Sequence, residues 1–271
     1  MIKFSTLISI YEKESPEFFR QALNSLKAQT LPADEIVIVK DGTVGSELES
    51  VLTQYATKLP LKVVGYEQNR GLGYALAFGL QHCRYDWVAR MDADDIAVKD
   101  RFEKQIAYLE QHPEIGLLGS STLEFDKSID DAVRGRIVPC THKKIIAYLK
   151  KRSAFNHMTV FFRKKDVLDA GNYKECSDFE DYYLWVRMAL SGVLMANMPD
   201  PLVYARVGND LIGRRIGFRY ARHEYCFYKK IRELNFLSFF EFIEIICMRI
   251  PLRLIPKSML AFIYIKMLRN H

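Results

Sequence analysis

The stretch Trp87-Val88-Ala89-Arg90-Met91-Asp92-Ala93-Asp94-Asp95 places three carboxylates within four positions, directly after a short apolar run. Such runs form buried strands, and the ligand sites of open α/β sheets lie just beyond the carboxyl ends of strands. Three like charges this close repel one another, and a divalent cation bridging to a phosphate is their usual compensation. The stretch therefore predicts a metal site or, alternatively, an acidic turn in which Asp95 or Asp100 caps the next helix.

Strand and helix patterns alternate on the N-terminal side of this stretch. Apolar or β-branched runs at 3–10, 35–39, 61–66 and 86–91 are typical of strands. Helical patterns lie between them: one begins at Ser15-Pro16, an N-cap followed by proline, a second covers about 46–57, and a third runs from Gly71 to about His82. This β-α-β-α-β-α-β order predicts a mainly parallel sheet with helices on both faces, an α/β architecture of the nucleotide-binding type.

The pattern is less regular after the acidic stretch. Helices are expected over about 99–111, 142–151 and 179–191, and strands over 115–119, 159–163, 194–198 and 202–207. At about Arg214 the composition changes, because basic and aromatic residues begin to alternate. We therefore predict a catalytic-type α/β domain over residues 1–213 and a separate helical tail over residues 214–271.

Bulk composition is that of an ordinary globular protein. Of 271 residues, 49% are hydrophobic and 27% are charged. Five cysteines, at positions 83, 140, 176, 226 and 247, form no C-x-x-C pair, so neither a zinc site nor a disulfide framework is indicated. Free thiols suit a reducing cytosol, and a strand-like run that follows Met1 at once predicts no signal peptide.

The positive charge belongs to the tail. Residues 214–271 hold twelve Lys/Arg and four Asp/Glu, a net of +8, whereas the whole chain has +6 and the first 213 residues therefore carry −2. Charged residues interrupt every apolar stretch of the tail, so no run approaches the roughly 20 uncharged residues of a spanning helix. The pattern favours an amphipathic tail lying on an anionic membrane surface. The alternative is that its helices pack on the main domain or on a second subunit.

Four polar segments follow the four predicted parallel strands, and the ends of such strands form one crevice. There the ring of Tyr11 can stack on a base, and the carboxylate of Asp41 can accept a base N–H. Asp92 and Asp94 can hold a ribose and a metal-bound diphosphate. Taken singly, Tyr11 could be ordinary surface and Asp41-Gly42 only a turn, but their common order and spacing favour a nucleotide site.

With these motifs the chain resembles an inverting family 2 glycosyltransferase of the GT-A fold, from the bacterial O-antigen and exopolysaccharide branch. The resemblance covers roughly residues 3–210. It is carried by four segments: residues 89–95 with Arg101 and Gln105, residues 177–185 (Ser-Asp-Phe-Glu-Asp-Tyr-Tyr-Leu-Trp), residues 69–72 (Asn-Arg-Gly-Leu), and residues 155–160 (Phe-Asn-His-Met-Thr-Val).

The resemblance implies a role for each matching position. Asp94 would coordinate Mn²⁺ or Mg²⁺, Asp92 would contact the ribose, and Asp41 would bind uracil. Asp181 would be the general base that takes the proton of the acceptor hydroxyl. The remaining residues implied in nucleotide-sugar binding are Tyr11, Glu12, Asn69, Arg70, Gly71, Arg90, Ala93, His157 and Glu180.

Several of these assignments have a simpler alternative. The Asp-Asp-Gly-Ser usual in the family is Lys40-Asp41-Gly42-Thr43 here, which puts the details of base recognition in doubt. Glu180-Asp181 opens an amphipathic helix, where acidic residues are favoured by the helix dipole alone. His157 could line the active site or be a structural histidine. Arg90 and Arg101 could neutralise the aspartates rather than touch a substrate.

The resulting hypothesis is a metal-dependent inverting enzyme acting on the cytoplasmic face of the cell membrane. It would move a hexose from UDP-glucose, UDP-galactose or an N-acetyl form to a lipid-diphosphate-linked saccharide in the inner leaflet. One alternative is a sugar-1-phosphate nucleotidyltransferase, but such an enzyme would need a glycine-rich loop after the first strand, and this chain has Tyr11-Glu12-Lys13-Glu14 there. The other alternative is a non-enzymatic basic protein that binds nucleic acid. No nucleic-acid partner is expected, since the basic excess sits in an apolar tail.

Overall fold

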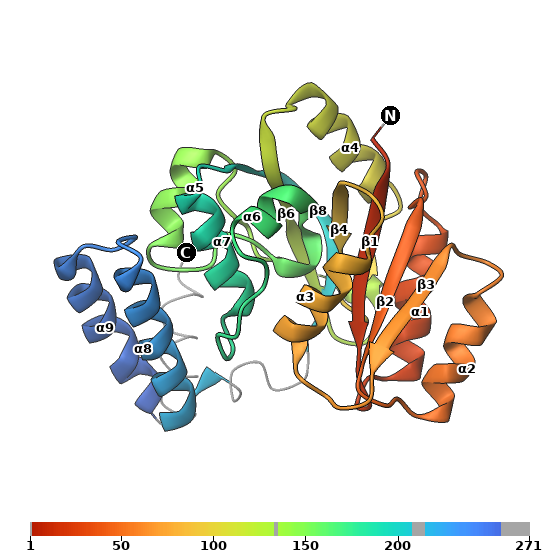
Figure 1. Ribbon diagram of the computed structural model, residues 1–271, viewed down its shortest axis with the longest axis horizontal. Coiled ribbons are helices and arrows are strands. Elements are labelled where there is room, and N and C mark those ends of the chain that lie inside the picture. The colour runs from red at the N-terminus through yellow and green to blue at the C-terminus, as the bar shows by residue number, and fades with distance from the viewer. Residues whose placement is uncertain (1, 133–134, 208–214, 256–271) are drawn as a thin grey trace.

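The structure, a computed structural model, describes residues 2–132, 135–207 and 215–255 (Figure 1). The boundary expected at 213 and 214 and the apolar stretch 259–265 of the tail lie outside these residues. Eight strands of the described part form one sheet in the order β3-β2-β1-β4-β7-β6-β8-β5. They are β1 (Phe4–Ile10), β2 (Glu35–Asp41), β3 (Leu61–Tyr66), β4 (Trp87–Arg90), β5 (Ile96–Ala97), β6 (Ile115–Phe125), β7 (Phe161–Arg163) and β8 (Leu194–Arg206).

The first four strands are parallel and adjacent, as the alternating pattern predicts. β1 pairs with β2 on one side and with β4 on the other, and β3 extends β2. β7 then joins antiparallel to both β4 and β6. Because β1 to β4 run in the same direction, the loops that follow them all lie at one edge of the sheet.

Helices cover both faces of this sheet (Figure 1). α1 (Pro16–Lys27), α2 (Ser46–Tyr55) and α4 (Arg101–Gln111) pack on one face. The other face carries α3 (Leu72–His82), α5 (His142–Leu149), α6 (Lys164–Asp169) and α7 (Glu180–Leu190). Alternation along the strands makes this possible, because Leu7 and Ile8 are both fully buried but belong to the two opposite cores.

The predicted helix start at Ser15 is confirmed in detail. The Ser15 hydroxyl accepts the backbone N–H of Phe18, and Pro16 occupies the first helical position. Other predictions were wrong in extent. The two strands expected at 194–198 and 202–207 are one strand, β8, because a bulge opposite Ser120 and Ser121 accommodates the prolines between them. β5 and α6 were not expected at all.

The described part of the tail is a helical hairpin of α8 (Phe218–Glu233) and α9 (Phe239–Leu254). One face of α8 enters the same core as α7, where Phe227 stacks on Phe179 with ring centroids 4.9 Å apart. Glu224, which is fully buried on α8, holds α9 by ion pairs to Arg249 (2.6 Å) and Arg253 (2.7 Å). The packing alternative considered for the tail therefore holds for this face of α8. No helix in the described ranges is long and apolar enough to cross a membrane.

Candidate active site

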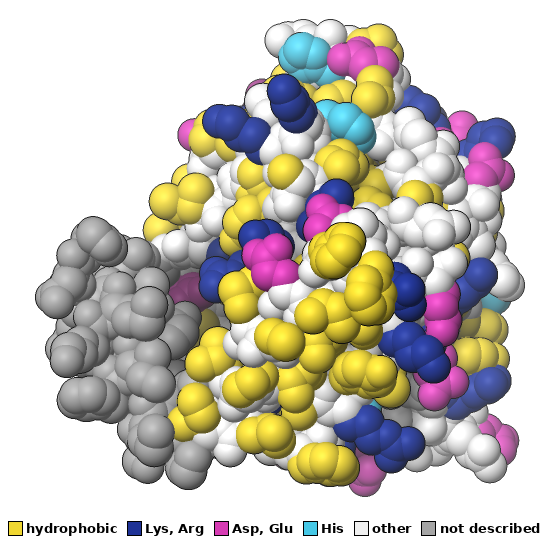
Figure 2. Space-filling view, turned by 90° about the vertical axis from the view of Figure 1, so that its left-hand side faces the viewer, with side chains coloured by type: hydrophobic (Ala, Val, Ile, Leu, Met, Phe, Trp, Pro, Cys, Tyr) yellow, Lys and Arg dark blue, Asp and Glu magenta, His cyan; other side chains and the backbone are white. Residues whose placement is uncertain are grey.

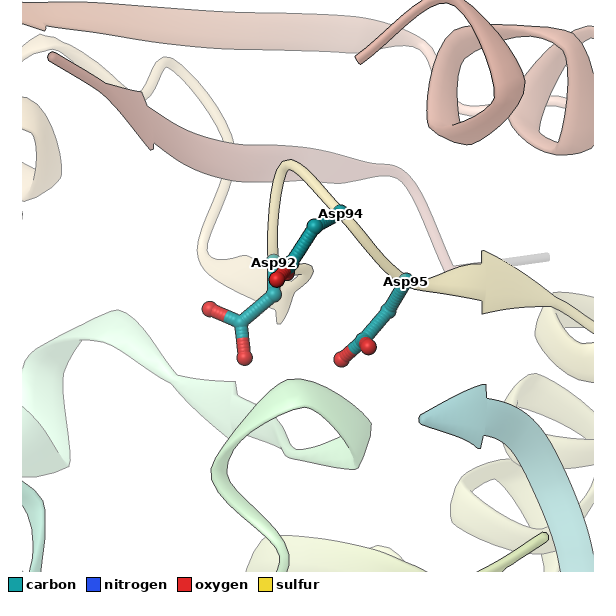
Figure 3. Close-up of side chains that lie close together, drawn as sticks. All are labelled: Asp92, Asp94 and Asp95. Atoms are coloured by element: carbon teal, nitrogen blue, oxygen red, sulfur yellow. The ribbon is translucent and has the colours of Figure 1, made fainter. Parts of the chain in front are cut away.

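The acidic stretch forms the turn between β4 and β5. Asp92, Asp94 and Asp95 each offer a carboxylate oxygen that lies within 4.8 Å of the oxygens of the other two. Figure 3 shows the three side chains on the same side of the turn. This is an all-oxygen donor set of the kind that hard divalent cations prefer.

Asp95 is buried, and it does not cap the next helix as one interpretation predicted. Its Oδ1 accepts the backbone N–H of Arg206 at 2.8 Å, because β5 intervenes and directs the side chain away from α4. Asp100, the other candidate cap, directly precedes α4 but makes no side-chain cap and pairs with Lys104 instead. The buried Oδ2 of Asp95 has no hydrogen-bond partner among the described residues. An unsatisfied buried carboxylate oxygen fits a cation better than it fits a bare turn.

Electrostatics at the turn also favour a cation. Burial raises the pKa of Asp94 and Asp95, and the neighbouring aspartates raise it further. Burial, together with the charges of Asp94 and Asp92, raises the pKa of Glu14 to about 7. Glu14 lies on the loop after β1, and the sequence analysis chose Glu12 there instead. The loop contains two glutamates, and the sequence alone does not indicate which of them lies nearer the aspartates.

Arg90 is buried directly before the acidic turn and pairs with it. Its side chain is 1% exposed, and its Nη1 donates to Oδ1 of Asp92. Burial raises the pKa of Asp94 and of Asp181, and the positive charge of Arg90 offsets part of that rise in both carboxyl groups. Arg101 holds the backbone of Arg90 in place, since its guanidinium donates to the backbone oxygen of Arg90 at 2.8 Å. This geometry agrees with the neutralising alternative for Arg90, whereas Arg101 bonds to the backbone oxygen of Arg90 and to the side chain of Gln105.

Arg206, at the end of β8, is a residue that sequence reasoning missed. Its guanidinium lies between the rings of Phe18 and Phe125, 3.9 Å and 4.4 Å from their centroids. Its Nε donates to the backbone oxygen of Asp94 at 3.1 Å, while its backbone N–H holds Asp95. Arg206 thus anchors the acidic turn from more than a hundred residues away, and no local pattern could have indicated that.

Asp41 ends β2 and binds the loop that leads into α3. Its Oδ1 accepts the hydroxyl of Tyr66 (2.8 Å) and the N–H of Arg70 (2.7 Å), and its Oδ2 accepts the N–H of Gly71 (3.0 Å). Asn69 returns a bond to the backbone oxygen of Asp41. Four residues predicted to bind the nucleotide, Asp41, Asn69, Arg70 and Gly71, are therefore in contact. Asp41 holds this loop in place, and its proposed contact with uracil stays a prediction.

Glu180 and Asp181 occupy the first turn of α7. Burial raises the pKa of Asp181, although the N–H of Tyr182 and the charge of Arg136 lower it. Burial, together with the charges of Asp181 and Asp178, raises the pKa of Glu180 to about 7. Both carboxylates are partly buried at the helix start, so they are less solvated than ordinary first-turn acids.

The other predicted residues lie around these groups. Tyr11 is 39% exposed and Glu12 is also exposed on the loop after β1, whereas Ala93 is buried inside the acidic turn. His157 lies in a 3-10 turn, where its Nε2 is 3.0 Å from the hydroxyl of Tyr173. Burial and then the charge of Arg90 hold the pKa of His157 well below its usual range, so the ring is neutral.

Comparison with known proteins agrees with this geometry. Residues 5–171 match the family described as glycosyl transferase family 2. The chain belongs to that family. It is a glycosyltransferase, which decides against the nucleotidyltransferase and the non-enzymatic alternatives.

Three glycosyltransferases are similar to this chain over nearly their whole length. The amylovoran biosynthesis glycosyltransferase AmsE of Erwinia amylovora is 42% identical over 97% of this chain and 98% of its own. The UDP-Gal:alpha-D-GlcNAc-diphosphoundecaprenol beta-1,3-galactosyltransferase of Escherichia coli is 37% identical over 99% and 97%. An uncharacterized glycosyltransferase of Haemophilus influenzae is 48% identical over 99% and 100%.

Solved structures support the fold. S. aureus TarS 1-349 in complex with UDP-GlcNAc has a TM-score of 0.65 at 21% identity, covering 84% of this chain and 66% of that one. The mannosyltransferase PcManGT from Pyrobaculum calidifontis, in complex with GDP-Man and Mn²⁺, has a TM-score of 0.64 at 18% identity, covering 85% and 64%. The predicted GT-A fold is thereby confirmed.

Proposed function

We propose that this enzyme transfers a hexose, with inversion, from a UDP-sugar to a lipid-diphosphate-linked saccharide in the synthesis of a surface polysaccharide. The single observation that carries the proposal is the cluster of Asp92, Asp94 and Asp95 after β4, whose carboxylate oxygens lie within 4.8 Å of one another beside the ion pair of Arg90 with Asp92. Such a cluster can hold a metal-bound diphosphate donor, and Asp181 at the start of α7 is the carboxylate proposed to take the acceptor proton. The relatives support the acceptor class, since the Escherichia coli enzyme's name includes a diphosphoundecaprenol-linked sugar.

The acidic turn is the proposed site of a divalent ion, Mn²⁺ or Mg²⁺. The carboxylates of Asp94 and Asp92 are partly exposed and can reach this ion, and buried Asp95 offers its Oδ2, which has no hydrogen-bond partner among the described residues. When bound, such an ion would stabilise the charge of the departing diphosphate. PcManGT, which is similar in fold, was solved in complex with GDP-Man and Mn²⁺, and this supports the proposal of a divalent ion.

Asp181 is the proposed general base. Transfer with inversion is a single displacement, in which a carboxylate takes the proton of the acceptor hydroxyl as that oxygen attacks the anomeric carbon. Burial raises the pKa of Asp181, which makes it a stronger base than an exposed aspartate, and the charges of Arg136 and Arg90 limit that rise. Arg90 also neutralises Asp92, so the donor's negative charge meets fewer uncompensated carboxylates.

The donor is proposed to lie across the ends of β1, β2 and β4. The exposed ring of Tyr11 is available for stacking on the base, and Oδ2 of Asp41 keeps one lone pair for a base N–H after accepting from Gly71. Lys40, the departure from the family pattern, pairs with Glu49 at 2.8 Å. Lys40 is therefore turned away from Asp41 and leaves the base contact open.

The tail is proposed to hold the enzyme on the inner face of the cell membrane. One side of α9 is buried, while the other carries exposed apolar side chains, among them Phe240 (83% exposed) and Leu254 (53%). Figure 2 shows hydrophobic side chains gathered on this side of the molecule, with lysines and arginines around them. The basic excess of +8 in residues 214–271 suits anionic lipids.

The transfer itself is tested with Asp181→Asn. We expect this variant to lose transfer to a diphospholipid-linked sugar while it still binds UDP-sugar in the presence of Mn²⁺, as measured by calorimetry. Asp169→Asn, at an exposed position at the end of α6, is the matched control and should keep activity within a few-fold. Undiminished transfer by Asp181→Asn would overturn the assignment of the base.

Membrane binding is tested by flotation with vesicles containing phosphatidylglycerol. Phe240→Ser combined with Ile243→Ser should leave most of the protein unbound. Ile137→Ser, which removes an apolar side chain that is 81% exposed elsewhere on the surface, should not change flotation. Equal binding of both variants would show that α9 is not the membrane contact.

A further inference from the structure

A cleft separates the first turn of α3 from the tail. It has a volume of about 610 Å³ and is lined by three segments that are far apart in the sequence. The start of α3 contributes Arg70, Gly71 and Tyr74, the loop before α7 contributes Asp178 and Glu180, and α8 contributes Arg219 and His223. The cleft contains none of the aspartates of the acidic turn, so it is distinct from the proposed metal site.

Cations from separate elements face this cleft. Arg70 lies flat on the ring of Tyr74, 3.4 Å from its centroid, which fixes the guanidinium at the rim. Arg219 is exposed and makes no ion pair with any described residue. His223 is already engaged, since its Nδ1 lies 2.7 Å from Asp178. That pair neutralises Asp178, one of the three acids in the lining. Burial raises the pKa of Glu180 to about 7, so the two arginines face the carboxylate of Glu175 and a partly protonated Glu180.

The backbone adds positive potential to the same space. α3, α7 and α8 all begin at the cleft, and none of the three has a side-chain N-cap hydrogen bond. Helix N-termini attract anions because their first N–H groups point outward. The two arginines favour a negatively charged ligand, and the three helix N-termini add to that preference.

The cleft meets the active site at Glu180, the residue next to Asp181. α3 and α7 touch there: a Cβ added to Gly73 would lie 2.7 Å from Cγ of Glu180. A ligand in the cleft is therefore next to the proposed base, and it also borders Arg70 and Gly71 of the loop that Asp41 holds. The acceptor approaches from the side of the base, opposite the departing diphosphate.

We propose that this cleft binds the diphosphate of the lipid-linked acceptor, with Arg70 and Arg219 as its charged contacts. This inference rests on the proposed function. The acceptor sugar then bridges from its own diphosphate in the cleft to the hydroxyl next to Asp181. Phe218, which is 77% exposed and precedes Arg219, extends the apolar side of the tail to the mouth of the cleft, where the lipid would leave.

The tail thus acts as one wall of the acceptor site as well as a membrane contact. Arg219 belongs to the tail alone, whereas Arg70 and Gly71 are also expected to serve the donor. A substitution of Arg219 should therefore affect binding of the acceptor diphosphate and leave binding of the donor diphosphate unchanged.

The experiment compares two acceptors with the same undecyl chain. One is N-acetylglucosamine joined through a diphosphate, and the other is the uncharged undecyl glycoside of that sugar. In Arg219→Gln we expect KM for the charged acceptor to rise about tenfold, as for loss of a charge-assisted hydrogen bond. KM for the uncharged acceptor and for the UDP-sugar should not change. Arg222→Gln, the same substitution on an exposed position of α8 outside the cleft, should match the wild type throughout.

Binding without turnover gives an independent measurement. Undecyl diphosphate titrated into the full-length chain should bind Arg219→Gln about tenfold more weakly than the wild type. An unchanged KM and affinity, an equal loss for the uncharged acceptor, or a raised KM for the donor would each overturn the proposal. If the wild type transfers to neither acceptor, the proposed function fails, and the titration still decides what the cleft binds.

Discussion

Replacing Asp41 by asparagine is expected to destabilise the protein through the loop that the carboxylate holds. The carboxylate is buried and accepts three hydrogen bonds, two on Oδ1 and one on Oδ2. Asparagine keeps only one carbonyl oxygen. In the better of its two orientations this oxygen retains Tyr66 and Arg70, and the amide N–H₂ then faces the N–H of Gly71. Two donors face each other, so one charge-assisted bond is lost and one N–H is unsatisfied.

The expected cost is about 2–4 kcal/mol in the free energy of unfolding, since a bond to a charged group contributes about 1.5–3 kcal/mol and an unsatisfied buried donor costs about 1–3 kcal/mol. Urea unfolding followed by tryptophan fluorescence measures it. Asp34→Asn is the control, because exposed Asp34 accepts a single backbone N–H, from Phe4 at 3.1 Å. That control should lose less than about 1 kcal/mol.

Equal unfolding free energies for Asp41→Asn and the wild type would refute this reasoning. Affinity for UDP, measured by calorimetry in the same buffer, should fall in Asp41→Asn alone, because the loop 69–71 is no longer held. If the variant kept its unfolding free energy but lost its affinity for UDP, the role of Asp41 would instead be contact with the uracil base alone.

Three further changes test other parts of the structure. Glu224→Gln should cost about 3 kcal/mol, because it leaves two arginines without their buried partner, whereas Glu233→Gln, a surface pair, should cost less than about 1 kcal/mol; chemical denaturation at neutral pH compares them. Gly73→Ala should lower kcat several-fold with little change in unfolding free energy, because the new Cβ displaces Glu180 while alanine favours the helix; steady-state kinetics and urea unfolding read the two effects. Because the pKa of Glu180 is raised from 4.5 to about 7 in the folded state, the folded protein binds its proton more tightly, and stability should fall as pH rises from about 4.5 to 7 and then level off. Glu180→Gln should remove that part of the pH dependence and be more stable than the wild type at pH 8 by about 2 kcal/mol; a pH profile as steep as that of the wild type would contradict it.

Glu224 also has a pH dependence of the opposite sign. Burial alone would raise its pKa, but the hydrogen bonds and charges of Arg253 and Arg249 lower it below the ordinary value. A lowered carboxyl pKa contributes stability above the unfolded-state pKa, and this contribution is lost as the pH falls through the folded-state value. The hairpin of α8 and α9 should therefore loosen in acid, which hydrogen exchange of α9 can follow.

The sequence by itself determined the alternation of strands and helices through residue 91, the helix start at Ser15 and the place of the acidic turn. These features depend on local spacing: β-branched runs, an N-cap, and carboxylates directly after a buried strand. The parallel order of the first four strands also follows from that alternation, and it places Tyr11, Asp41, Arg70 and Asp92 at one edge of the sheet.

Only the tertiary structure decided which side chains meet at that edge. Arg206 reaches Asp94 and Asp95 from β8, the charges of Asp94 and Asp92 act on Glu14, and Arg219 closes a cleft that begins at α3. Each of these contacts joins segments whose distance in the sequence carries no periodic signal. They arise because the packing of α1 and α7 on the sheet, and of α8 on α7, sets the position of the side chains, and that packing is a property of the whole chain.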